Sequence, residues 1–260
     1  MKSILITISI ILGLTLNTIS SENNSVISTI KLKLYNAYVS DNSSMWIEGM
    51  NELKSSYKKT NSINTLFELS KSQYGYMGLL IDKQEFEKAK KILPEAEKNI
   101  TKLLEQNPEW ADAYALLAGI YGFKIILYPN LVIYNGPKGK NYMEKASELK
   151  NITPAVIIEM GNYKYHTPTL LGGNIDEAIL YYKKAINQIE IKKQDKNNWQ
   201  YINAMVWLAI SYDKKGENDK ALATLNKLLE KEPNLIYVKK ELYPKIAKKG
   251  SIEKTYYTLK

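Results

Sequence analysis

The only histidine in the chain, His166, lies in the stretch YHTPTLLGGN at residues 165–174. A histidine can ligate a metal or transfer a proton near neutral pH. With Glu159 and Asp176 it could form a mixed metal site, but the spacing matches no known metal motif and a histidine-based site needs more than one. The same stretch also reads as a bend between two helices, which is the interpretation we favour. His166 is kept as a candidate ligand residue of this loop.

Other catalytic chemistry finds little support. Cysteine is absent, which excludes disulfides, thiolate metal sites and a cysteine nucleophile. No G-x-S-x-G turn, phosphate-binding loop or G-x-G-x-x-G run occurs. The carboxylate pairs Asp176/Glu177 and Glu85/Glu87 fall early in expected helices, where they favour the positive end of the helix dipole. We therefore expect no catalytic residues, no metal and no cofactor, and the chain is not predicted to be an enzyme.

Although the chain is basic, the type and the distribution of its basic residues argue against nucleic-acid binding. The formal net charge is +9, yet every one of the 36 basic residues is lysine. Nucleic-acid readers rely on arginine, whose planar fork engages guanine and phosphate through two hydrogen bonds. Here the lysines are spread along the chain and interleaved with glutamates, which is typical of a solvated helical surface.

The beginning of the sequence reads as a secretory signal peptide. Lys2 is followed by the apolar run ILITISIILGLTL at residues 4–16 and by the small residues Thr18 and Ser20. We expect cleavage after Ser20, which gives a signal peptide of residues 1–20 and a periplasmic or secreted protein that is not a lipoprotein. The run is short for a membrane span, which needs about 20 residues. An uncleaved N-terminal anchor remains the alternative.

The sequence pattern predicts a helix hairpin most clearly for residues 203–234. Apolar and small side chains recur at helical spacing on either side of KKGEND, and these are Met205, Leu208, Ala209, Tyr212, Ala221, Leu225 and Leu228. The glycine ends the first helix, the Asn/Asp pair begins the second, and EPN ends it.

This hairpin resembles the tetratricopeptide repeat, with Ala209 and Ala221 where small residues let the two helices approach closely. The resemblance implies an all-α fold, a helix-turn-helix repeat solenoid wound as a right-handed superhelix. Weaker copies of the pattern extend it to about five helix pairs within residues 21–260. The expected repeats lie near residues 27–57, 70–106, 111–151, 155–190 and 201–234, with a C-terminal cap at 235–260.

Two stretches interrupt the period. Residues 124–141, KIILYPNLVIYNGPKGKN, are expected to form an ordered insertion or loop rather than helix, because they combine proline, glycine and β-branched residues. In residues 165–174, Pro168 should stop one helix, Gly172 and Gly173 should permit the return, and Asn174 should cap the next helix. The sequence GNYKYHTPTLLGGNIDEA also resembles a subgroup of exported bacterial repeat proteins, which implies architecture and localisation only.

The resemblance also implies a concave wall built from the first helix of each pair. The positions expected to face a partner there are Lys71, Tyr74, Gly78, Asp112, Gly119, Asn162, Tyr165 and Asn203. They lack the lysine/asparagine set with which some family members hold a terminal carboxylate. The small residues Gly78, Ala115 and Gly119 leave room for a partner peptide, or for residues 124–141 folded back into the groove. Alternatively, they serve only to let the helices pack tightly.

The function predicted from these observations is that of an exported, non-enzymatic scaffold. It would bind another protein or a peptide in the cell envelope, without nucleic acid and without a membrane span once the signal is removed. The alternative is a small-molecule carrier or transporter accessory protein, with a cavity between the repeats and the 165–174 loop. The oligomeric state is left open.

Overall fold

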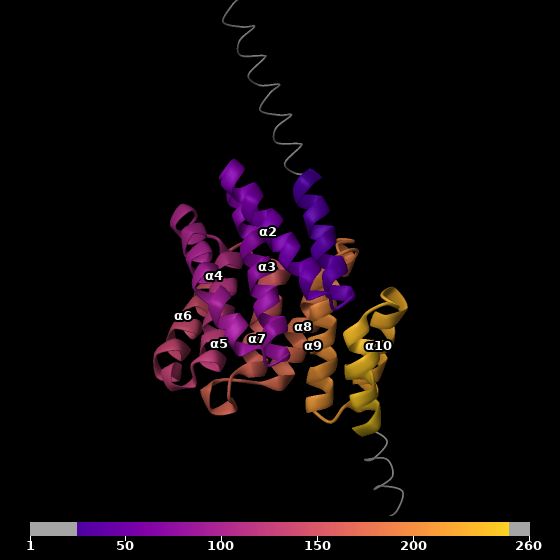
Figure 1. Ribbon diagram of the computed structural model, residues 1–260. Coiled ribbons are helices and arrows are strands. Elements are labelled where there is room, and N and C mark those ends of the chain that lie inside the picture. Colours follow the sequence, from indigo (N-terminus) through magenta and orange to yellow (C-terminus); the bar gives the residue numbers. More distant parts are fainter. Residues whose placement is uncertain (1–24, 250–260) are drawn as a thin grey trace, which may run out of the picture.

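The computed structural model describes residues 25–249, and within this range the chain forms helices and no strands (Figure 1). Residues 25–39 are helical and are called the N-terminal helix below. The α-helices that follow are α2 (Ser43–Thr60), α3 (Ile63–Asp82), α4 (Phe86–Gln106), α5 (Ala111–Leu127), α6 (Val132–Glu148), α7 (Pro154–His166), α8 (Ile175–Ile191), α9 (Trp199–Lys214) and α10 (Asn218–Lys231). Short turns η1 (Pro129–Leu131) and η2 (Thr169–Leu171) precede α6 and α8, and η3 (Val238–Leu242) leads into helical residues 243–249.

Successive helices pair as hairpins that stack side by side along the molecule (Figure 1). Helix α3 packs on α4, α5 on α6, α7 on α8 and α9 on α10, while the first helix of each pair also contacts the first helix of the next pair. The predicted all-α repeat solenoid is confirmed. Within residues 25–249, no helix combines the length and the apolarity that crossing a bilayer requires.

Small residues set the distance between paired helices. Ala209 and Ala221 are fully buried between α9 and α10, as predicted, and Gly216 takes the positive φ of +82° in the turn between them. At Gly161 on α7, an added Cβ would lie 2.7 Å from the ring of Tyr182 on α8. A larger side chain at Gly161 would therefore force this pair of helices apart.

The prediction of a loop or insertion for residues 124–141 is wrong. Helix α5 continues to Leu127, and α6 runs through Pro137. A proline inside a helix leaves the carbonyl four residues earlier without its donor. That residue, Ile133, is 78% exposed, so water can reach the freed carbonyl. Gly139 then lets α6 approach α5 closely, since a Cβ there would lie 3.3 Å from Tyr121.

The N-terminal helix connects the two ends of the solenoid. Its residues Ile30 and Leu34 belong to the apolar core of the first repeats, whereas Tyr35 and Val39 belong to the core of the last repeats. The Tyr35 hydroxyl also donates a hydrogen bond to Glu232, just beyond α10. In Figure 1 this helix stands between α2 and the C-terminal repeats.

Aromatic rings complete this junction, and we call Tyr38, Trp46, Gly75 and Trp199 the closing contact. The rings of Trp46 and Trp199 lie 5.5 Å apart, centre to centre, and Tyr38 lies 6.0 Å from each of them. An added Cβ on Gly75 would lie 2.9 Å from Trp199 and 3.0 Å from Trp46. The superhelix is therefore wound tightly enough for α9 to touch α2 and α3 across the concave face.

Replacing Trp199 with alanine should open this junction. We expect the free energy of unfolding to fall by about 2 kcal/mol, because a large, partly buried ring is lost. The radius of gyration in solution scattering should increase slightly, because Trp199 supplies the ring contact of α9 with α2 and α3 while the N-terminal helix still joins the two ends. The matched control is Trp110→Ala, which also removes a partly buried ring, here packed 4.7 Å from Phe67 and outside the closing contact. Equal radii for the two variants would contradict the closing role.

Candidate functional site

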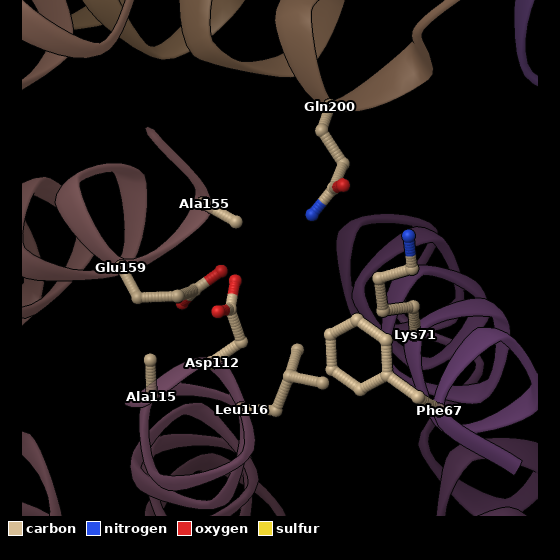
Figure 2. Close-up of a pocket in the computed structure, with 8 residues that line it drawn as sticks. All are labelled: Phe67, Lys71, Asp112, Ala115, Leu116, Ala155, Glu159 and Gln200. Carbon is tan, nitrogen blue, oxygen red and sulfur yellow. The ribbon is translucent and has the colours of Figure 1, made fainter. Parts of the chain in front are cut away.

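A small cleft lies on the concave face, where α3, α5, α7 and α9 meet (Figure 2). Of the predicted groove residues, Lys71 and Asp112 line it. The complete lining is Phe67, Lys71, Asp112, Ala115, Leu116, Ala155, Glu159 and Gln200. The cleft is partly open to solvent and has room for about one water molecule.

Asp112 is held at one wall of the cleft. It lies in the first turn of α5, and its Oδ1 accepts a hydrogen bond of 2.6 Å from the hydroxyl of Thr153, the residue that caps α7. Burial raises the pKa of Asp112, while the Thr153 hydrogen bond and the charge of Lys71 act against this. Lys71 itself forms an ion pair of 2.9 Å with Glu68 and lies 5.2 Å from the centre of the Phe67 ring.

Glu159 is the buried centre of a hydrogen-bond network. Its Oε2 accepts from the Tyr74 hydroxyl at 2.7 Å and from the Asn162 amide at 3.0 Å, and Tyr182 donates to Asn162 at 2.7 Å. Only 6% of Glu159 is exposed, and this burial raises the pKa of its carboxyl to about 7. The network ties α3, α7 and α8 together through a carboxylate that has no ion pair within the described residues.

Sequence reasoning considered Glu159 only as a possible metal ligand. The missed signal is a lone acidic residue in the apolar run PAVIIEM, where a carboxylate must be buried with polar partners or exposed to a cavity. Glu159 has polar partners, Tyr74 and Asn162, and it also lines the cleft. The hypothetical metal site does not form: Glu159 bonds to Tyr74 and Asn162, and Asp176 pairs with Lys215 at 2.6 Å. Residues 25–249 contain no group of three or more metal-ligating side chains of the kinds that could hold an ion.

The remaining predicted groove residues contact this chain's own side chains. The ring of Tyr74 covers Gly119, where an added Cβ would lie 2.7 Å from it. Gly78 faces Phe123, and the side chain of Asn203 accepts a hydrogen bond of 3.3 Å from Tyr38. The room left by Gly119 is thus filled by Tyr74, and not by residues 124–141.

The stretch 165–174 is the bend that the sequence predicts. Gly172 has φ +96°, and a Cβ on Gly173 would lie 1.7 Å from the carbonyl oxygen of Thr167. Asn174 caps α8 by accepting from the backbone N–H groups of Asp176 and Glu177. The backbone N–H of Asn174 also donates to Lys164, so the turn is fixed at both ends.

His166 ends α7 and packs against two rings. Its imidazole lies 4.8 Å from both Tyr165 and Trp207, centre to centre. Loss of solvent against these rings, with the nearby charge of Lys214, lowers the pKa of His166. A carrier cavity at this loop would need Asn162, Tyr165 and His166 to line one common space. Instead, Asn162 bonds to Glu159 and Tyr182, while Tyr165 and His166 contact Trp207.

Exposed apolar side chains occur on the turns that follow α5 and α7 and at the adjoining ends of α5 and α6, and we call these residues the loop edge. Both turns lie along the lower side of the molecule in Figure 1. Its members are Ile126, Leu131, Val132, Ile133, Tyr134, Leu170 and Leu171. Leu170 is fully exposed and Leu171 is 67% exposed, although the turn that carries them is fixed by hydrogen bonds.

Comparison with known proteins agrees with the repeat pattern. A family model described as tetratricopeptide repeat matches residues 203–235. A thermophilic TPR protein from Thermus thermophilus, TTC0263, is similar over 88% of this chain and 97% of its own, with 19% identity and a TM-score of 0.52. MamA is similar over 73% of this chain and 90% of its own, with 21% identity and a TM-score of 0.36. No curated protein sequence matches this chain significantly.

The buried carboxyl of Glu159 should make stability depend on pH. Its pKa is raised from 4.5 to about 7, so between these values the folded state holds a proton that the unfolded state has lost. The wild-type chain should therefore lose stability as pH rises from 4.5 to 7, by at most about 3 kcal/mol from this group. Glu159→Gln cannot titrate, and its stability relative to wild type should rise across the same window and level off above pH 7.

Chemical denaturation at a series of pH values measures this difference. Glu144→Gln is the control, since it removes a carboxylate from an exposed position on α6. A constant offset between Glu159→Gln and wild type over the whole pH range would show that Glu159 titrates normally.

Proposed function

We propose that this chain, a tetratricopeptide repeat protein, is an exported, non-enzymatic scaffold that binds a partner protein in the cell envelope through its loop edge. The repeat fold supports a role in protein–protein interaction. The proposal depends on one observation above all, the fully exposed Leu170 on a turn that is fixed by hydrogen bonds.

The loop edge has the properties of a docking surface. Large apolar side chains exposed together commonly mark interaction sites. The Lys164 side chain donates to the carbonyl of Gly172 at 3.2 Å and pairs with Glu177 at 2.8 Å, which further orders the turn. Because the turn is already ordered, a partner gains the burial of Leu170 and Leu171 with little loss of conformational entropy.

The concave face supports a partner peptide less well. Tyr74 covers Gly119, the closing contact joins α9 to α2 and α3, and the cleft between them has room for about one water molecule. An extended peptide would need the superhelix to open. The loop edge needs no such change.

Export is the second element of the proposal, supported by the signal-like residues 1–20, which lie outside the described residues. Chain purified from the cell envelope should begin at Ser21. Intact-mass analysis measures this directly, because removal of residues 1–20 lowers the mass by a fixed amount. A mass that retains these residues would favour the uncleaved anchor instead.

Substitution of Leu170 by aspartate should release the partner. A buried leucine contributes about 1.5–3 kcal/mol, so recovery of the partner with tagged protein from envelope extracts should fall about tenfold or more. Folding should be unchanged, since the side chain is fully exposed. Leu180→Asp is the matched control, because Leu180 is 64% exposed but lies within α8 and is not part of the loop edge. Unchanged recovery with Leu170→Asp, or equal losses with both variants, would refute the loop edge as the docking surface.

A further inference from the structure

We propose that the cleft between α3, α5, α7 and α9 binds a primary ammonium group, as carried by a lysine side chain or a small aliphatic amine. Glu159 and Asp112 would accept its hydrogen bonds from one side, and Gln200 from the other. This site lies outside the loop edge and does not depend on it.

Each carboxylate has one oxygen without a side-chain partner, although the Asp112 carboxylate also accepts a hydrogen bond from its own backbone N–H. Glu159 uses Oε2 for both Tyr74 and Asn162, and Asp112 uses Oδ1 for Thr153. Within the described residues, neither Glu159 Oε1 nor Asp112 Oδ2 has a side-chain partner. Figure 2 shows the two carboxylates turned toward the same space.

An ammonium group supplies three N–H donors and no acceptor, which matches converging oxygens. The side-chain amide of Gln200 faces this space from α9 in Figure 2. A half-turn of that amide exchanges its nitrogen and its oxygen, so it can present a third acceptor. The cleft then satisfies all three donors.

The charge around the cleft favours a cation. Lys71 is its only lysine and is already paired with Glu68. The positive end of the α5 dipole stabilises the negative charge of Asp112, which lies in the first turn of that helix. Glu159 lies beyond the first turn of α7, where the dipole of α7 stabilises its charge little. A buried carboxylate without a cation is costly, and an ammonium ligand would relieve that cost. The raised pKa of Glu159 is the sign of this unrelieved burial.

The size and the walls of the cleft select among cations. An ammonium head is about as large as the one water molecule for which there is room, whereas trimethylammonium and guanidinium groups are larger. Ala115, Leu116 and the ring of Phe67 offer an apolar wall to the attached methylene chain. The described residues around the cleft lack the third carboxylate or imidazole that a metal site would require.

The test is a titration of the full-length chain with pentylamine, followed by NMR of the Gln200 side-chain amide and by calorimetry. Pentan-1-ol and trimethylpentylammonium are the matched ligands, since one lacks the charge and the other exceeds the size. We expect measurable binding of pentylamine alone.

Variants of the cleft residues should change the affinity for pentylamine, some lowering it and one raising it. Glu159→Gln and Asp112→Asn should weaken pentylamine binding, the former about tenfold or more, because a charge-assisted hydrogen bond is lost. Lys71→Met should tighten it by removing a neighbouring positive charge, a result that damaged folding would not produce. Glu144→Gln is the control for the loss of one carboxylate at a distance and should change nothing.

A capped pentapeptide with one lysine, and the same peptide with trimethyl-lysine, distinguish the sources of the amine. Binding of the lysine peptide about tenfold tighter than pentylamine would identify a partner protein's lysine, and equal binding would identify a small amine. Pentan-1-ol binding as well as pentylamine, or Glu159→Gln binding pentylamine as tightly as wild type, would overturn the proposal and leave a cleft that holds only water. Neither result would bear on the loop edge.

Discussion

The contact of Trp199 with Gly75 is the constraint on which the concave face depends. A side chain at position 75 would meet the rings of both Trp46 and Trp199, so a larger residue there would have to displace one of these rings. The close approach of α9 to α3 places Gln200, the residue next to Trp199, opposite Lys71 and Asp112 (Figure 2). A more open superhelix would carry Gln200 away and turn the cleft into part of a wide groove. The glycine at position 75 and the N-terminal helix that bridges the two cores therefore set the width of the concave face together.

Within that closed face, the Glu159 network takes the place of apolar packing. Tyr74 lies over Gly119 with its hydroxyl on Glu159, while Tyr182 covers Gly161 and donates to Asn162. Each tyrosine thus fills the space beside a glycine and supplies a hydrogen bond to the same buried network. Burying a carboxylate opposes folding, but its two donors and the packing of both rings offset part of that cost. Such an arrangement specifies how α3, α7 and α8 fit together.

Local pattern explains why the hairpins were predictable and the closure was not. The stripe through Ala209 and Ala221 repeats at helical spacing, and its packing is between neighbours in the sequence. The sequence did not predict the helix through Pro137. The proline is tolerated because Ile133, whose carbonyl loses its donor, is exposed to water, and the exposure of Ile133 is known only from the structure. The hydrogen bond between Tyr38 and Asn203 joins residues 165 positions apart, and no periodicity encodes it. Glu159 could have been noticed as an isolated acid with Asn162 one turn further along the same helix, but its partner Tyr74 on α3 could not.

Helix α7 relates the two surfaces to each other. Its first turn contributes Ala155 to the cleft and its body contributes Glu159, whereas its last residue, His166, leads into the loop edge. Asp112 and Gln200 likewise lie in the first turns of α5 and α9, and the exposed turn at Pro129–Leu131 follows the end of α5. The cleft and the loop edge therefore occupy opposite ends of the same helices. A partner bound at the turns need not cover the cleft, so one molecule could hold a protein at one edge and a cationic group near the other.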